Sequence, residues 1–246
     1  FFTGDTAGIT VSASLQCKIH TFCTVTEDNF EPTQPFVNGA RPDGDATITY
    51  TPTRGNIDAW EPEYFYSFYK PGQTNININF PDVPTTRCDH AIPGNNTVAG
   101  CVFPGWTPTH TYYLSGDYPE LATHIYYAQQ SGLPGAATGS GMPNTSPLRR
   151  LISAEEQGDN RKTACPDRYV RPATKSCDEY PFASSRQGAD TGGGPGRTFD
   201  FCQIPDLPVN VTGPTGYSAC MIDKVQNSNG GTNMNQYLYI WYRVLD

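Results

Sequence analysis

Residues 177–185 read Cys-Asp-Glu-Tyr-Pro-Phe-Ala-Ser-Ser, and a Gln-Gly pair follows at 187–188. Two adjacent carboxyl groups, Asp178 and Glu179, stand between a cysteine and an apolar Tyr-Pro-Phe cluster. The surrounding window 149–186 holds eight basic residues against six acidic ones, so this part is locally basic in a chain of net charge −8. Such a face can bind phosphates because salt screens acids that lie more than about 10 Å away. Taken alone, an Asp-Glu pair is most often a solvated turn and a mixed-charge window an ordinary surface.

The cysteines indicate an oxidising compartment. Eight are present, with no Cys-x-x-Cys pair and no zinc-site spacing. Three Asn-x-Ser/Thr sequons, at Asn95, Asn144 and Asn210, are candidate glycosylation sites. We therefore expect a secreted, extracellular, disulfide-bonded glycoprotein whose signal peptide has been removed. Pairing of sequence neighbours gives the expected disulfides, although eight cysteines allow many other pairings: Cys17–Cys23, Cys88–Cys101, Cys165–Cys177 and Cys202–Cys220.

The first hundred residues predict a β-rich region. Runs of β-branched or aromatic residues occur at 8–17, 46–52, 64–69 and 75–80, and turn-forming clusters separate several of them. This pattern is typical of an antiparallel sandwich or barrel. We expect residues 1–100 to form a sandwich-like accessory region.

Beyond residue 100 the pattern becomes mixed. Strands are expected at 107–115 and 217–225, and helices at 118–132 and 232–245, where apolar residues recur at helical spacing. The polar segment 226–231 is expected to join the last strand to the last helix. The expected fold class is α+β, with a second domain at 101–246. No apolar run is long enough to span a membrane, and we expect a monomer.

The 177–188 stretch resembles the signature of the NucA/NucB deoxyribonucleases, which carry an Asp-Glu-[Trp/Tyr]-Pro-[Phe/Met]-Ala core. Segments 107–129, 147–151, 160–166 and 225–238 resemble other parts of that family, in the same order along the chain. The resemblance implies a small, disulfide-bonded nuclease domain of the ββα-metal type. In this family an acidic residue takes the place of the usual base histidine.

The resemblance also implies a metal site. Asp178 would be the general base or a carboxylate close to the metal, with Glu179 beside it. Asn227 would be the ligand from the last helix, and Asn235 a second one. The turn before Asn235 is one residue shorter than in the family pattern, which leaves two other asparagines open as the ligand: Asn229 and Asn233. Oxygen ligands of this kind suit a divalent cation such as Mg²⁺, Mn²⁺ or Ca²⁺.

Basic residues near the signature are expected to hold the DNA substrate. Arg161 and Arg186 are candidates for clamping the scissile phosphate, because a guanidinium binds phosphate oxygens in pairs. Further phosphate or DNA contacts are expected from Arg149, Arg150 and Gln236. Phosphate contacts carry no sequence information, so the expected reaction is largely sequence-nonspecific endonucleolytic hydrolysis.

Several alternatives stay open. His110 or His124 could be a catalytic base, although a packed structural histidine is the more common case. The aromatic residues of 1–100, among them Trp60, could bind a carbohydrate or cell-wall ligand, and the whole chain could be a catalytically inactive glycoprotein with that role. The intact Asp178-Glu179 pair argues against an inactive member. A glycosidase is disfavoured, because adjacent carboxylates rarely face each other across a bond at the required ~5–9.5 Å.

Overall fold

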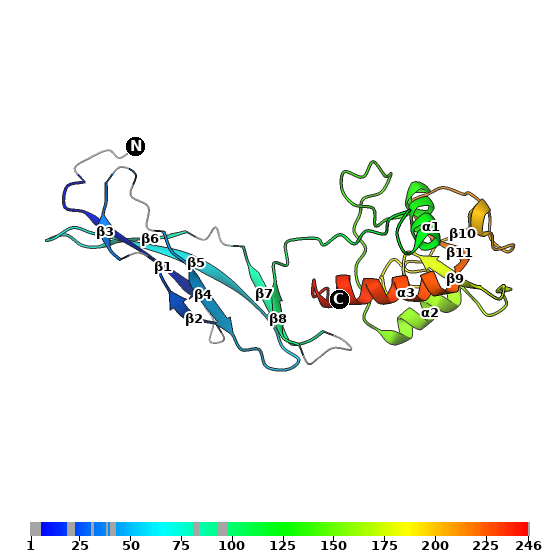
Figure 1. Cartoon of the computed structure of the whole chain (residues 1–246), viewed down its shortest axis with the longest axis horizontal. Helices are drawn as coiled ribbons and strands as arrows, with labels where there is room; N and C mark the ends of the chain where they lie inside the picture. The colour runs from blue at the N-terminus through cyan, green and yellow to red at the C-terminus, as the bar shows by residue number, and fades with distance from the viewer. Residues whose placement is uncertain are drawn as a thin grey trace. The chain divides into compact units, whose positions relative to one another are not determined.

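The computed structural model describes residues 6–18, 23–30, 32–37, 39, 43–80, 84–92 and 98–245. The chain divides into two compact units, Phe1–Trp106 and Thr107–Asp246 (Figure 1). Strands dominate the first unit and helices join strands in the second, which confirms the α+β class. No helix among the described residues is long and apolar enough to cross a membrane.

The first unit is built from antiparallel strands. Its described elements are β1 (Thr10–Lys18), β2 (Cys23–Asp28), β3 (Gln34–Pro35), β4 (Ala46–Tyr50), β5 (Ile57–Tyr69), β6 (Ile76–Phe80), β7 (Thr86–Asp89) and β8 (Gly100–Val102). One sheet has the order β3-β1-β5-β7-β8, with β6 also beside β5, and β2 pairs with β4 in a second sheet. Trp60 packs with the half-cystines Cys23 and Cys88 in a small core to which both sheets contribute. The described sheets have open edges, so the barrel alternative is wrong, whereas the four expected strands are confirmed.

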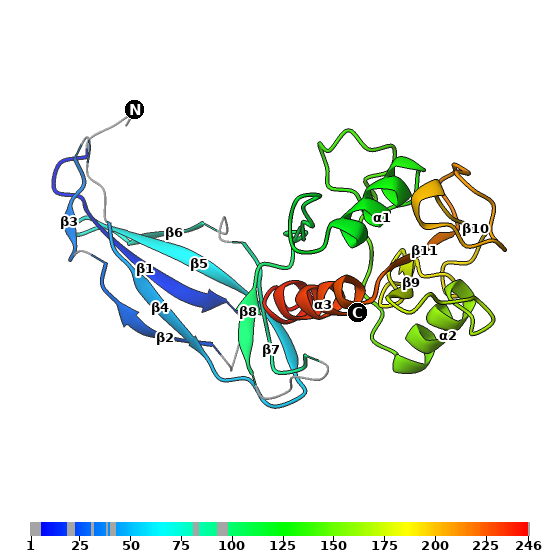
Figure 2. The same ribbon diagram turned by 45° about the vertical axis from the view of Figure 1, so that its right-hand side comes forward.

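The second unit has a three-stranded sheet with helices on both faces. Its elements are α1 (Pro119–Gln130), α2 (Ala154–Ala164), β9 (Lys175–Tyr180), β10 (Gly196–Arg197), the short helix η1 (Asp200–Cys202), β11 (Tyr217–Asp223), α3 (Lys224–Met234) and the π-helical turn η2 (Asn235–Ile240). The strand order is β10-β11-β9, and β9 runs antiparallel to β11. Figures 1 and 2 show α1 and α2 on opposite sides of β9 and β11.

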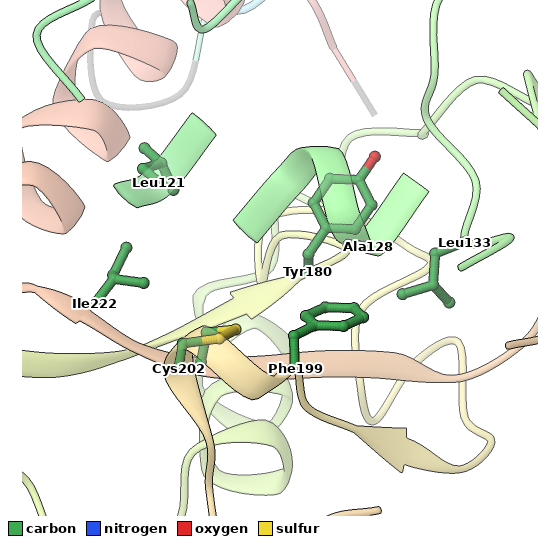
Figure 3. Close-up of a cluster of buried hydrophobic side chains, with 8 residues drawn as sticks. Leu121, Ala128, Leu133, Tyr180, Phe199, Cys202 and Ile222 are labelled. Carbon is green, nitrogen blue, oxygen red and sulfur yellow. A yellow bond between two sulfur atoms is a disulfide. The ribbon is translucent and has the colours of Figure 1, made fainter. Parts of the chain in front are cut away.

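Two apolar clusters hold these layers together. Leu121 and Ala128 of α1 pack against Tyr180 and Ile222 on one face of the sheet (Figure 3). On the other face, Ala164 of α2 belongs to a second cluster with residues of β11. Successive side chains of a strand point to opposite faces, so the neighbours Asp178 and Glu179 of β9 face different helices.

Two sequence-based expectations for this unit are wrong. Residues 107–115 form no strand; instead the Tyr112 hydroxyl donates a hydrogen bond to the carbonyl of Gly230, 2.7 Å away. The last helix begins at Lys224 rather than 232, because the Asp223 carboxylate caps it by accepting hydrogen bonds from two backbone N–H groups. The segment 226–231 is therefore helix. A Cβ on Gly230 would lie 2.2 Å from Leu121 Cδ2, so glycine here permits the close approach of α3 to α1.

One expected helix, one expected strand and the four expected disulfide pairings are confirmed. Residues 118–132 contain α1, and 217–225 contain β11. All four expected disulfides are present, because sequence neighbours meet on adjacent elements: Cys17–Cys23, Cys88–Cys101, Cys165–Cys177 and Cys202–Cys220. Cys165 ends α2 and Cys177 lies on β9, so their bond ties the helix to the strand that carries the signature.

Candidate active site

A cavity of about 510 Å³ opens at the signature strand of the second unit. Residues of β9, α2, α3 and η2 line it, together with the segment 182–184 that follows β9. It gathers most of the side chains to which the sequence assigned chemistry: Asp178, Glu179, Asn227, Asn235, Arg150 and Arg161. Residues from separate parts of the sequence therefore share one space.

Asp178 lines this cavity and is the last member of a row of three hydrogen-bonded side chains, Ser218, His124 and Asp178. Its Oδ2 atom lies 2.6 Å from Nδ1 of His124 on α1, and Nε2 of His124 lies 2.9 Å from the Ser218 hydroxyl on β11. His124 and Ser218 are completely buried, whereas Asp178 lines the cavity. The row has the composition of a Ser-His-Asp triad, but its serine is sealed from substrate and cannot be the nucleophile. Its carboxylate is the end that meets the cavity.

Glu179 lies on the face of β9 that meets α2. The pKa of its carboxyl group is raised to about 7: burial and then the charge of Asp178 raise it, whereas Arg161 and backbone hydrogen bonds act to lower it. The side chain also contacts the Cys165–Cys177 disulfide, with Oε2 3.9 Å from the Cys165 sulfur. The cavity thus holds the carboxyl groups of two residues adjacent in sequence, and the pKa of one of them is raised.

Asn227 lies in the first turn of α3, where its side chain is held against β9. Its Nδ2 group donates to the Ser176 hydroxyl at 3.0 Å and to the Cys177 carbonyl at 3.2 Å. Because both bonds use the amide nitrogen, the amide oxygen is the part of the side chain left to serve as a ligand.

Two guanidinium groups share the cavity with these oxygen-bearing side chains. Arg150 is buried and stacks on the ring of Tyr239 with its central carbon 4.3 Å from the ring centre, and it also donates to the Val244 carbonyl. The Tyr239 hydroxyl is 2.7 Å from that of Ser184. Arg161 is exposed on α2. The site combines anionic and cationic walls, as binding of a cation together with a phosphate ester requires.

The comparisons with known proteins agree with this chemistry. The family model described as Deoxyribonuclease NucA/NucB matches residues 125–239. This region is therefore similar to the NucA/NucB deoxyribonucleases, and we call it the NucA/NucB domain. The match begins within α1 and contains β9, β11, α3 and the cavity residues Asp178, Glu179 and Asn227. No curated protein and no solved structure matches the chain.

Three basic or polar residues predicted for the NucA/NucB site lie outside the cavity: Arg149, Arg186 and Gln236. All three are exposed, and the backbone N–H of Arg186 donates to the Arg149 carbonyl at 2.9 Å. The neighbours Arg149 and Arg150 therefore have different environments. Asn229 and Asn233 also lie outside the lining, as does His110, whose pKa is lowered by burial.

Asn160 is a residue of the NucA/NucB domain to which the sequence assigned no role. It is completely buried on α2, where Nδ2 donates to the carbonyls of Ala183 and Ser185, and Oδ1 accepts from the backbone N–H groups of Asp190 and Thr191. It thereby fixes the segment that lines the cavity after β9. The sequence signal that could have found it is its place at the start of the segment 160–166, which resembles the family.

Among the described residues, no three His, Cys, Asp or Glu side chains gather as a metal site. The oxygen donors that line the cavity include the carboxyl groups of Asp178 and Glu179 and the amide oxygen of Asn227. Oxygen donors of this number, with water completing the shell, fit a hard divalent cation such as Mg²⁺.

The glycosylation candidates differ in their surroundings. Asn95 lies outside the described residues. Asn144 donates to the Gly132 carbonyl at 3.2 Å, and Asn210 is exposed and donates to Asp200 at 2.6 Å. Modification at the latter two stays a prediction.

Proposed function

We propose that this chain is a secreted, metal-dependent endonuclease that hydrolyses DNA phosphodiester bonds with little sequence preference. The supporting observation is the cavity at the signature strand, where Asp178, Glu179 and Asn227 share space with Arg150 and Arg161. Carboxyl and amide oxygens are ligands for a hard cation, and guanidinium groups are ligands for a phosphate. Four disulfides favour an oxidising environment outside the cell.

Asp178 acts as the base in this proposal. A water molecule attacks phosphorus in line with the leaving oxygen, Asp178 takes the water's proton, and the bond from phosphorus to the leaving oxygen breaks. The leaving oxygen takes a proton from solvent. Asp178 suits the role because it lines the cavity at the strand that carries the family signature.

The other cavity residues bind and orient. Asn227, which is hydrogen-bonded to β9, and the carboxyl group of Glu179 would hold the cation. When bound, the cation stabilises negative charge on the phosphate and the leaving oxygen. Arg161 and Arg150 would hold the phosphate. Asn235 follows Asn227 by eight residues, about 12 Å along a helix. We therefore assign Asn235 to the substrate rather than to the same cation.

The proposal is tested with supercoiled plasmid, which an endonuclease nicks and an exonuclease leaves intact. We expect the purified full chain to cut with Mg²⁺, Mn²⁺ or Ca²⁺ and to stop in EDTA. Asn227→Ala should need a much higher cation concentration for half-maximal rate. The matched control is Asn229→Ala, two residues along the same helix and outside the cavity, which should behave as wild type. Absence of cutting with every cation, or cutting that resists EDTA, would contradict the proposal.

A further inference from the structure

Helix α1 carries a histidine in the middle of its buried apolar stripe. Leu121 and Ala128 flank His124 at three and four residues' distance, and all three are buried against the sheet. An aliphatic side chain would fill such a position without any polar group to satisfy. A histidine here has to be explained by what its ring nitrogens contact.

Each ring nitrogen has one partner. Nδ1 is 2.6 Å from the Asp178 carboxylate, and Nε2 is 2.9 Å from the Ser218 hydroxyl, which in turn lies 3.4 Å from the Tyr180 carbonyl. An ionised carboxylate only accepts hydrogen bonds, so the Nδ1–H group donates to Asp178. The ring is thus fixed from both ends, and it fixes the carboxylate in turn.

We infer that His124 is a positioning residue for the nuclease reaction, and that Ser218 orients its ring. The inference rests on the proposed function, in which Asp178 takes a proton from water. A carboxylate at the wall of a cavity can rotate about its side-chain bonds and spend time in unproductive orientations. The bond from Nδ1, made where both His124 and Ser218 are sealed from water, holds one oxygen and so orients the other. Outer-shell partners of this kind typically change activity by about 10–100-fold when removed.

Two near-isosteric variants separate this role from simple packing. In His124→Asn the amide nitrogen occupies the place of Nδ1, so the bond to Asp178 is kept. In His124→Gln the amide nitrogen reaches the place of Nε2, so the contact with Ser218 is kept and the one with Asp178 is lost. We expect His124→Asn to retain kcat within a few-fold of wild type. We expect His124→Gln to lose about 10–100-fold in kcat, with KM changed less than about threefold.

The experiment measures plasmid-nicking kinetics and Tm for the full-length wild type and both variants. A fall in kcat in both variants that follows their fall in Tm would overturn the inference, and so would a His124→Gln variant as fast as wild type. Either result leaves the proposed nuclease function standing. If the wild type fails to cut plasmid with any of the cations tested, the proposed function itself is overturned. If His124→Gln does not fold, Ser218→Ala takes its place. A three- to tenfold fall in kcat with KM kept supports the inference, and an unchanged kcat overturns it.

Discussion

Replacing Asn160 by alanine removes the side chain that holds the cavity segment to α2. The substitution removes the bonds to the buried Ala183 and Ser185 carbonyls and to the backbone N–H groups of Asp190 and Thr191, two exposed residues. The Ser185 carbonyl keeps the Gly188 N–H as a donor, so the Ala183 carbonyl is the buried group that loses its partner. An unsatisfied buried acceptor costs about 1–3 kcal/mol, so the substitution should destabilise the domain by about that much.

The assay is urea unfolding followed by circular dichroism, together with hydrogen exchange of residues 183–191. We expect Asn160→Ala to lower the unfolding free energy by that amount and to speed exchange at the Asp190 and Thr191 amides. Lys162→Ala is the control on the same helix, because it removes only an exposed ion pair with Asp159, and such surface pairs contribute little to stability. An Asn160→Ala variant within about 1 kcal/mol of wild type, with slow exchange kept, would refute the reasoning.

Three further predictions concern α3, the arginines and Glu179. Gly230→Ala should lower Tm because its Cβ meets a side chain of α1, whereas Gly231→Ala, in open space on the same helix, should raise it through better helix propensity. Arg161→Ala should raise KM for DNA about tenfold and Arg186→Ala less than threefold, since only the former lines the cavity. The raised pKa of Glu179, about 7 against an ordinary 4.5, gives a stability contribution that is complete below pH 4.5 and lost as pH rises to about 7. In EDTA, the free energy of unfolding should therefore fall by at most about 3 kcal/mol over that pH range. Glu179→Gln should remove most of this pH dependence.

The strands of the first unit could be predicted because their alternation of apolar and polar residues is local. Strand β9 could not, since its sequence Lys-Ser-Cys-Asp-Glu-Tyr devotes central positions to polar side chains of the cavity. Helix α2 has few apolar residues, and its one local sign is a cap: the Ser153 side chain accepts from the N–H of Glu156. Glycine is common in turns, so Gly230 and Gly231 led to the prediction of a connecting segment at 226–231, where the chain is helical.

The candidate site was predictable as far as the family signature extends. Asp178, Glu179 and Asn227 were named from the sequence, and the fold brings them to one cavity. The choice between the neighbours Arg149 and Arg150 could not be made, because burial of Arg150 depends on η2, far along the chain. The partners of His124 likewise depend on tertiary packing rather than on any local pattern.

The most direct test of the account is single-turnover plasmid cleavage by Asp178→Asn. Asparagine keeps the size of the side chain and an oxygen for His124 but cannot take a proton from water. We expect the cleavage rate to fall by about 10²–10⁴-fold, the range for loss of a general base, while Tm and binding of uncut DNA stay close to wild type. A variant that cuts within tenfold of the wild-type rate would contradict the assignment of Asp178 as the base.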